Sequence, residues 1–485
     1  MSQNFDPAFG SAVDAAAAIR ARKISSLELT QLVFRRIDAF DPKLNAYVYQ
    51  MREEALEQAK LADDALARGV ARGALHGVPI NVKESFGVQG RPATWGVPAL
   101  KHSMAQRTSV PVRRLLDAGA VLLGATNVPQ NLMDCQSYND IYGTSNNPWD
   151  LARTPGGSSG GTAASLAAGL AFLSVGSDIG GSIRGPASFC GIYGHKPTLD
   201  IVNMSGHQPG GAQQAPGFST LLAVAGPMTR SAEDLEAGLA ILAGPELPDS
   251  KAMQWMLPPA RHSRLQDFRV GFVLEDAAVP VSAETKVVLE SAVKACGKAG
   301  AKVVHGWPAG FVFEEALNTY QFLLSAFNFS MMPADVQARV RPRLDAQSDP
   351  MAKGALSSFA EWQGQNFRRL GFRALWEKFF ETFDVFLSPA MFTTAIPHDH
   401  SEMSGRSIVT GDGIAHPYFD LVKYIVPASL TGCPATAAPA GLSKSGLPVG
   451  IQIMGPYLED ATPIAFARLL AREIGGFQAP AGYAS

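Results

Sequence analysis

Apolar residues near the start of the chain recur at helical spacing. The segments 11–22, 26–39 and 52–68 each repeat them every three or four residues, the pattern of a helix with one buried face. The period then changes. Residues 77–83 form a short apolar run that ends in Lys83, which is typical of a buried strand. The pattern therefore predicts N-terminal helices over about 10–68, followed by a segment that belongs to a sheet.

Strand-like and helix-like segments alternate along most of the remaining chain. The predicted helices cover 110–118, 160–169, 231–242, 283–296 and 462–474. The predicted strands cover 120–123, 170–175, 269–274, 301–304, 383–387 and 449–453. Such a rhythm favours parallel pairing. We find no linker or internal repeat, so residues 1–485 are expected to form one α/β domain. Its central sheet should be mixed, mostly parallel and covered by helices on both faces.

Composition narrows the class of protein. Charged residues are 17% of the 485 and hydrophobic residues 46%, which favours one large buried core. The formal charge of −2 gives no reason to expect a nucleic-acid partner. The start of the chain lacks the features of a signal peptide, and we find no apolar stretch long enough to cross a membrane. We therefore expect a cytoplasmic protein with no membrane partner.

Cysteine and histidine patterns do not indicate a metal. The four cysteines are far apart and form no CxxC pair, so neither a zinc site nor a disulfide framework follows. His398 and His400 flank Asp399, but two histidines at this spacing diverge on a helix and no third ligand is evident. We predict no metal and no cofactor.

Two glycine- and serine-rich clusters, at 156–161 (GGSSGG) and 176–184 (GSDIGGSIR), are the strongest chemical signal. Glycines let backbone N–H groups approach a ligand and form an anion-binding concavity. The first cluster also fits the G-x-S-x-G nucleophile elbow, which requires a preceding strand. Residues 147–155 contain two prolines and make a poor strand, so that interpretation is set aside.

Together with LHGVPINVKE at 75–84 and TNVPQ at 126–130, these clusters are similar in order and spacing to the amidase signature family. Its members are serine hydrolases of amides and of some esters and carbamates. The resemblance covers most of the chain and implies the amidase signature fold. It also implies a catalytic core over about 75–245 and substrate-side helices over about 310–380.

Roles follow from the resemblance position by position. Lys83 matches the catalytic lysine, Ser158 the bridging serine that follows a cis peptide bond, and Ser182 the nucleophile. The oxyanion hole would consist of backbone N–H groups, and further residues would support the site. The implied oxyanion donors are Ile179, Gly180, Gly181 and Ser182, and the implied supporting residues are Gly157, Ser159, Asp178 and Arg184. Glu84 and Ile179 stand where Asp and Thr are common in the family.

The implied chemistry requires the amine of Lys83 to be neutral. Only a neutral amine can accept the proton of a serine, and an unperturbed lysine has a pKa near 10.4. Burial lowers that pKa, and Val82 and Phe86 beside Lys83 indicate an apolar setting. Ser158 would relay the proton, since a hydroxyl both donates and accepts. The residues alone do not separate Ser158 from Ser159.

Three functions remain open. The first is a stand-alone amidase that acts on a small, hydrophobic or aryl amide, ester or carbamate through an acyl-enzyme on Ser182. The second is the A subunit of a glutamine-dependent tRNA amidotransferase, and the third is a non-catalytic binding protein on the same fold. Residues 206–217 could form a lid or pocket wall, and 311–332 could line an apolar pocket or fill the core. A homodimer is left open.

Overall fold

A large mixed sheet runs through the computed structural model, which describes residues 5–211, 221–345 and 349–483. From edge to edge its strands are β1 (Tyr47–Gln50), β3 (Val121–Thr126), β2 (Pro79–Lys83), β6 (Leu173–Asp178), β8 (Val224–Thr229), β7 (Tyr193–Lys196), β14 (Ala435–Leu442), β15 (Pro448–Met454), β11 (Val385–Pro389), β9 (Arg269–Phe272) and β10 (Lys302–His305). Two small hairpins lie outside it: β4 (Tyr138–Asn139) with β5 (Gly143–Thr144), and β12 (Ser407–Val409) with β13 (Ala415–Pro417).

Parallel pairing is confined to two blocks of this sheet. Strands β3, β2 and β6 form the first block, and β11, β9 and β10 form the second. The ladders between the blocks, and that of β1 with β3, are antiparallel. The predicted α/β class with a mixed sheet is confirmed, with a larger antiparallel share than the alternation suggested. Strands β14 and β15, for example, are joined by a turn too short for the crossover that parallel strands need.

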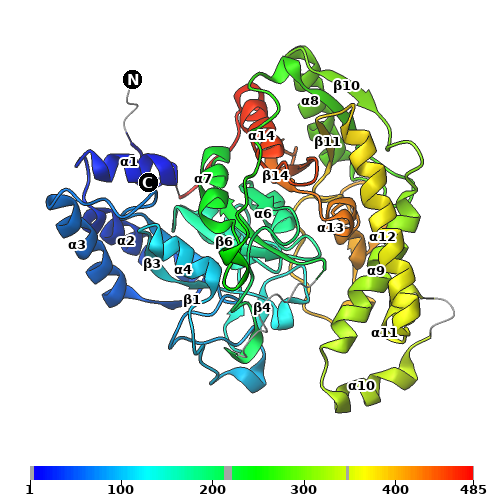
Figure 1. Ribbon diagram of the computed structural model, residues 1–485, viewed down its shortest axis with the longest axis horizontal. Coiled ribbons are helices and arrows are strands. Elements are labelled where there is room, and N and C mark those ends of the chain that lie inside the picture. The colour runs from blue at the N-terminus through cyan, green and yellow to red at the C-terminus, as the bar shows by residue number, and fades with distance from the viewer. Residues whose placement is uncertain (1–4, 212–220, 346–348, 484–485) are drawn as a thin grey trace.

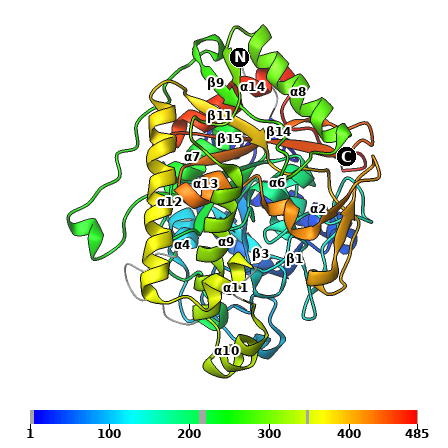
Figure 2. The ribbon, with the colours of Figure 1, turned by 90° about the vertical axis from the view of Figure 1, so that its right-hand side faces the viewer.

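Helices surround the sheet (Figures 1 and 2). Their bounds are α1 (Ala12–Arg20), α2 (Ser26–Leu44), α3 (Arg52–Ala67), α4 (Val110–Asp117), α5 (Gly160–Ala167), α6 (Arg184–Cys190), α7 (Ala232–Leu242), α8 (Ala283–Lys298), α9 (Phe313–Ser330), α10 (Ala334–Val340), α11 (Pro350–Ala355), α12 (Phe359–Phe380), α13 (Val426–Thr431) and α14 (Ala461–Ile474). Short 3₁₀ turns cover Pro98–Leu100, Gln130–Leu132, Pro209–Gly211, Asp249–Lys251, Leu265–Asp267, Arg341–Arg343, Met403–Gly405 and Tyr418–Val422.

Both faces of the sheet are covered, as predicted. On β6, Leu173 lies close to Gly238 of α7, whereas Gly176 lies close to Ser159 at the start of α5. Since side chains three residues apart on a strand point to opposite faces, α7 and α5 cover different faces. Figure 1 shows α1–α3 at one end of the molecule and α9 and α12 at the other.

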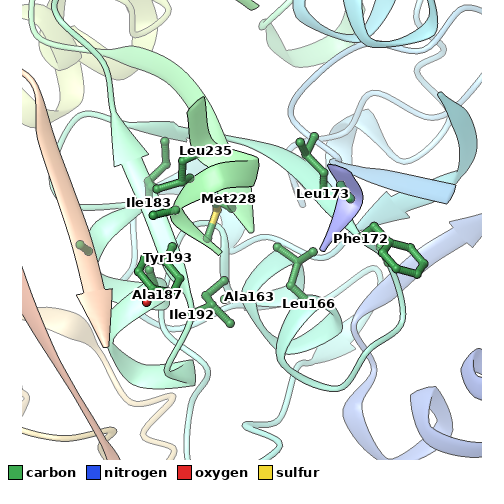
Figure 3. Packing of buried hydrophobic residues seen from close by; sticks show 14 of the residues in the cluster. Ala163, Leu166, Phe172, Leu173, Ile183, Ala187, Ile192, Tyr193, Met228 and Leu235 are labelled. Atoms are coloured by element: carbon green, nitrogen blue, oxygen red, sulfur yellow. The ribbon is translucent and has the colours of Figure 1, made fainter. Parts of the chain in front are cut away.

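The helices that follow the two glycine-rich clusters are firmly packed. Figure 3 shows Ala163 and Leu166 of α5, Ala187 of α6 and Met228 of β8 in one buried cluster. All four are fully shielded from solvent. Burying a side chain the size of leucine contributes roughly 1.5–3 kcal/mol, so this cluster fixes the two helices that begin just after the candidate serines. Within the described ranges, no helix has both the length and the apolar character needed to span a membrane.

Candidate active site

Strand β2 carries Lys83 into the interior at its last position. Every residue of β2 is buried, because β3 and β6 pair with it on either side. Lys83 itself has no exposed surface. Its amine nitrogen lies 2.6 Å from the Oγ of Ser158 and 2.9 Å from the Oγ of Ser177. The expected burial of Lys83 is therefore present, with two hydroxyls as the partners of the amine.

Ser177 is a contact that the sequence motifs did not indicate. It lies on β6, two residues after Val175, which pairs in parallel with Val82. That register brings Ser177 level with the end of β2 and hence with Lys83. Ser177 is visible in the sequence as a serine of the second cluster. Its contact with Lys83 depends on the pairing of β2 with β6, which local patterns do not reveal.

The electrostatic setting of Lys83 favours the neutral amine. Burial lowers the pKa of Lys83 from 10.5 to about 7, and the negative charge of Asp178 acts in the opposite direction. Each pKa unit corresponds to about 1.4 kcal/mol, so disfavouring the charged form by this much amounts to roughly 5 kcal/mol. A large fraction of Lys83 is then available as a base near neutral pH.

The two adjacent serines of the first cluster differ sharply in their contacts. Ser158 follows a cis peptide bond after Gly157 and contacts Lys83. The Oγ of Ser159 is buried and, within the described residues, has no hydrogen-bond partner. The backbone N–H of Ser159 instead donates to the carbonyl of Ser182, at 3.2 Å. Geometry thus separates two residues that the sequence alone left equivalent, and it joins the two clusters through the backbone.

Ser182 lies in the turn between β6 and α6. It retains 8% of its surface exposed, against 1% for Ser158 and none for Lys83. Among the described residues its Oγ has no hydrogen bond, so Ser182 is linked to the first glycine-rich cluster through its carbonyl, which accepts from the N–H of Ser159. The three residues form a series of decreasing burial, from Lys83 through Ser158 to Ser182.

Asp178 and Arg184 organise this turn. The Asp178 carboxylate accepts hydrogen bonds from the N–H groups of Gly181 (2.9 Å) and Ile183 (3.1 Å) and pairs with Arg184 at 2.8 Å, both side chains being fully buried. Burial alone would raise the pKa of Asp178, but the Arg184 charge and the backbone donors outweigh it and lower that pKa to about 2. Gly181 has φ +89°, a conformation that favours glycine.

The four implied oxyanion donors are not equivalent. The N–H of Gly181 already donates to Asp178. The N–H groups of Ile179, Gly180 and Ser182 have no acceptor within the described parts of the chain, which leaves them open to a ligand. Tyr320 of α9 steadies the same turn, since its hydroxyl donates to the carbonyl of Ile179 at 2.8 Å. Tyr320 was not among the site residues expected from the sequence.

Glu84 follows Lys83 in the sequence, but its side chain binds the loop at residues 94–95. Its carboxylate accepts hydrogen bonds from the N–H and hydroxyl of Thr94 and from the N–H of Trp95. Burial raises the pKa of Glu84 to about 7, and these donors oppose the shift. The side chain of Glu84 therefore shapes the loop after β2.

The remaining sequence candidates lie apart from this chemistry. In the described ranges, His, Cys, Asp and Glu side chains form no group of three suited to a metal. Asp399 instead bonds Ser401 and, through its backbone, Gln136. Of the suggested lid, residues 212–217 lie outside the described residues. In its described part, the ring of His207 packs against Phe86 and Trp95.

Comparison with known proteins decides the family. The family model described as Amidase matches residues 28–463. This chain belongs to the amidase family. A curated relative from Anaeromyxobacter dehalogenans, named as the A subunit of glutamyl-tRNA(Gln) amidotransferase, is 32% identical, and the alignment covers 96% of each chain.

Solved structures of the amidase family share the fold. A crystal structure of an amidase superposes with a TM-score of 0.78 at 26% identity, covering 96% of this chain and all of the other. A bacterial aryl acylamidase of the amidase signature family gives a TM-score of 0.80 at 24% identity, over 96% and 97% of the two chains. At that identity the second likeness shows the fold alone. The resemblance drawn from the sequence motifs is confirmed at the level of family and fold.

Proposed function

We propose that this chain hydrolyses an amide C–N bond through an acyl-enzyme on Ser182. The observation that carries the proposal is the 2.6 Å contact between the buried Lys83 amine and Ser158, in a chain of the amidase family. A general base contributes about 10²–10⁴-fold to a rate when its pKa lies near the working pH. Lys83, with a pKa lowered to about 7, meets that condition.

The proposed proton transfer runs along the three side chains and requires the Oγ of Ser182 to come within hydrogen-bond reach of Ser158 when substrate binds. As Ser182 attacks the carbonyl carbon, its proton passes to the Oγ of Ser158, and the Ser158 proton passes to neutral Lys83. Collapse of the tetrahedral intermediate breaks the C–N bond. The same path, reversed, delivers a proton to the leaving amine. A water molecule then repeats the sequence on the acyl-enzyme and releases the acid, which restores Ser182.

The charge that forms on the carbonyl oxygen needs donors. We assign this role to the N–H groups of Ile179, Gly180 and Ser182, which lack acceptors in the described structure. Each such donor is worth roughly 3–4 kcal/mol in the transition state. Gly181 keeps the turn in shape through its bond to Asp178.

A groove along α9, the helix that carries Tyr320, supports a hydrophobic substrate. It encloses about 500 Å³ and is lined by Leu222, Leu323, Phe327 and Trp362 among others. Leu323 lies one helical turn beyond Tyr320, which contacts Ile179. Leu222 comes two residues before Val224, the partner of Asp178 in the sheet. A small hydrophobic or aryl amide, or an ester or carbamate of similar shape, suits such a groove.

A second substrate is favoured by a different observation. The curated relative that covers 96% of this chain is named as part of a glutamyl-tRNA(Gln) amidotransferase, and this supports glutamine as the amide and a protein complex as the setting. Both candidates use the same Ser182 chemistry. They differ in the acyl group and in whether the chain works alone.

One assay separates the two candidates. The purified chain is offered an aryl anilide, a nitrophenyl ester and glutamine, and release of amine, phenol or ammonia is followed. We expect turnover of the anilide and the ester by the isolated chain. Ammonia release from glutamine in preference to both would favour the amidotransferase function. If the chain turns over none of the substrates, and Ser182 resists a fluorophosphonate, the non-catalytic binding protein is the better description.

A further inference from the structure

The backbone of residues 134–136 lies directly against the residue before Ser158. A Cβ placed on Gly157 would lie 2.2 Å from the carbonyl oxygen of Asp134 and 2.8 Å from backbone atoms of Cys135 and Gln136. Real Cβ atoms do not approach so closely. The place of Gly157, and of Ser158 after it, is therefore set by this neighbouring segment.

A buried ion pair holds the first residue of that segment. The Asp134 carboxylate accepts hydrogen bonds from Arg406 Nη1 at 2.7 Å and from the hydroxyl of Tyr418 at 2.5 Å. The side chains of Arg406 and Asp134 are 2% and 6% exposed. Arg406 also donates to the hydroxyl of Tyr138 and to the carbonyl of Ser401. Charge-assisted hydrogen bonds of this kind are stronger than neutral ones and also restrict the geometry of the groups they join.

Gln136 is fixed from the same side. Its amide N–H donates to the carbonyl of Asp399 at 2.7 Å, and its amide oxygen accepts from the Asp399 N–H at 3.0 Å. The Tyr418 hydroxyl, 3.2 Å from the Gln136 amide nitrogen, joins both ends of the segment. Residues 134 and 136 are thus tied to one strap, which we define as residues 395–406.

The strap also holds the chain just before the first glycine-rich cluster. The N–H of Thr154 donates to the carbonyl of Ile396 at 3.0 Å, and the N–H of His398 donates to the carbonyl of Ala152 at 3.2 Å. The Arg153 side chain donates to the carbonyl of Ala395 at 2.6 Å. The strap therefore contacts residues 152–154, which lead into the loop that carries Ser158. It also contacts residues 134 and 136, whose segment packs against Gly157 in that loop.

We propose that the strap 395–406, with Tyr418, is a clamp that positions Ser158 for proton relay, and that Arg406 and Tyr418 are positioning residues for the reaction. This inference rests on the proposed function. Stability alone is a weak explanation for the pair, because burying two charges costs desolvation energy that an apolar pair would not. A relay instead needs one hydroxyl held within hydrogen-bond reach of the amine, and small displacements are costly for that purpose.

The clamp acts on the rate of acylation. Tyr418→Phe removes the hydroxyl that joins Asp134 and Gln136 and retains the ring beside Arg406. We expect kcat to fall about three- to tenfold for Tyr418→Phe, and further for Arg406→Met, with KM within about twofold of the wild-type value. Arg406→Lys should recover part of the loss. Tyr424→Phe is the matched control, because that buried hydroxyl bonds Asp276 and Val279, away from the clamp.

The decisive measurement is a double-mutant cycle on the rate at which a fluorophosphonate labels Ser182. If the clamp works through Ser158, Tyr418→Phe slows labelling of the wild-type chain but not of the Ser158→Ala chain. Equal slowing of labelling in both backgrounds would overturn the proposal. So would a loss of kcat in Tyr418→Phe that is no larger than the loss in Tyr424→Phe at the same loss of thermal stability. No labelling of wild-type Ser182 would overturn the proposed function itself. Normal labelling of Tyr418→Phe with slow labelling of Ser158→Ala would overturn the clamp alone.

Discussion

At the scale of single residues, the three candidate catalytic side chains differ in how deeply they are buried. Lys83 is sealed, Ser158 is 1% exposed and Ser182 is 8% exposed. In the proposed mechanism, the same burial that lowers the pKa of the amine limits its proton exchange to the two hydroxyls it contacts, those of Ser158 and Ser177. That these three residues are candidates for the site could be predicted from the motifs. Their order in depth, and the contact of Lys83 with Ser177, could not, because both arise from strand pairing.

The first prediction concerns pH. In the proposed mechanism the active form has neutral Lys83, and burial lowers the pKa of Lys83 to about 7. Below that pH the amine is protonated and cannot accept a proton, so kcat/KM for an uncharged amide should rise with pH through about 7 and then level off. The profile should be recorded from about pH 5 to 9. A rate that stays constant across this range would contradict the neutral-lysine mechanism.

A second residue-scale prediction compares the adjacent serines. Ser158→Ala should reduce kcat by about 10²–10⁴-fold, the usual contribution of general-base catalysis, because Lys83 loses its contact with the reacting hydroxyl. Ser159→Ala removes a hydroxyl without a partner in the described structure and should change kcat far less. Ser182→Ala should abolish turnover and leave the thermal midpoint close to that of the wild type. Equal losses at 158 and 159 would refute the assigned relay.

At the scale of elements, local patterns predicted where helices begin better than where they end. Helix α2 continues past Pro42 to Leu44 and closes at Asn45, which has a left-handed φ of 47°. Helix α8 continues past Gly297 to Lys298. A proline or glycine in a last turn removes or weakens one interaction, and packing of the preceding turns compensates. Such compensation is tertiary, so the residues alone could not show it.

A prediction at this scale uses two glycines. Gly157→Ala places a Cβ against the backbone of residues 134–136, so the loop must shift; kcat and the thermal midpoint should both fall. Gly364→Ala, in α12 with no atom near the added Cβ, should stabilise the fold by up to about 1 kcal/mol. Thermal unfolding and kcat of both variants provide the comparison. A fully active Gly157→Ala enzyme would show that the segment 134–136 can yield.

At the scale of the whole molecule, the sheet interleaves distant parts of the chain. Strands β14 and β15, from near the end of the sequence, lie between β7 and β11. Alternation of strands and helices indicated the fold class but carries no information on such an order. The apolar pattern also failed at β14, where ATAAPAGL is rich in alanine, proline and glycine. Only pairing with β7 and β15 makes that segment a strand.

Arg184 links these distant parts and allows a global test. It pairs with Asp178 and donates to Ser429, Gln452 and the carbonyl of Ile425. Arg184→Met leaves Asp178 buried without its counter-charge, which should cost about 3–5 kcal/mol. Chemical denaturation followed by circular dichroism measures this loss. Adding Asp178→Asn should recover part of it, whereas a loss in Arg184→Met no larger than the roughly 0.5 kcal/mol typical of surface substitutions would show that the pair is dispensable.

The enclosure of Lys83 carries a consequence for chemical modification. Reagents that acylate or reductively methylate amines reach side chains at the surface, and the nitrogen of Lys83 has no surface to offer them. Under the proposed function, exhaustive treatment should therefore leave unchanged the rate at which the folded chain hydrolyses an ester. Mass spectrometry after such treatment would find the peptide that contains residue 83 unmodified, and modified only when the chain has been unfolded first.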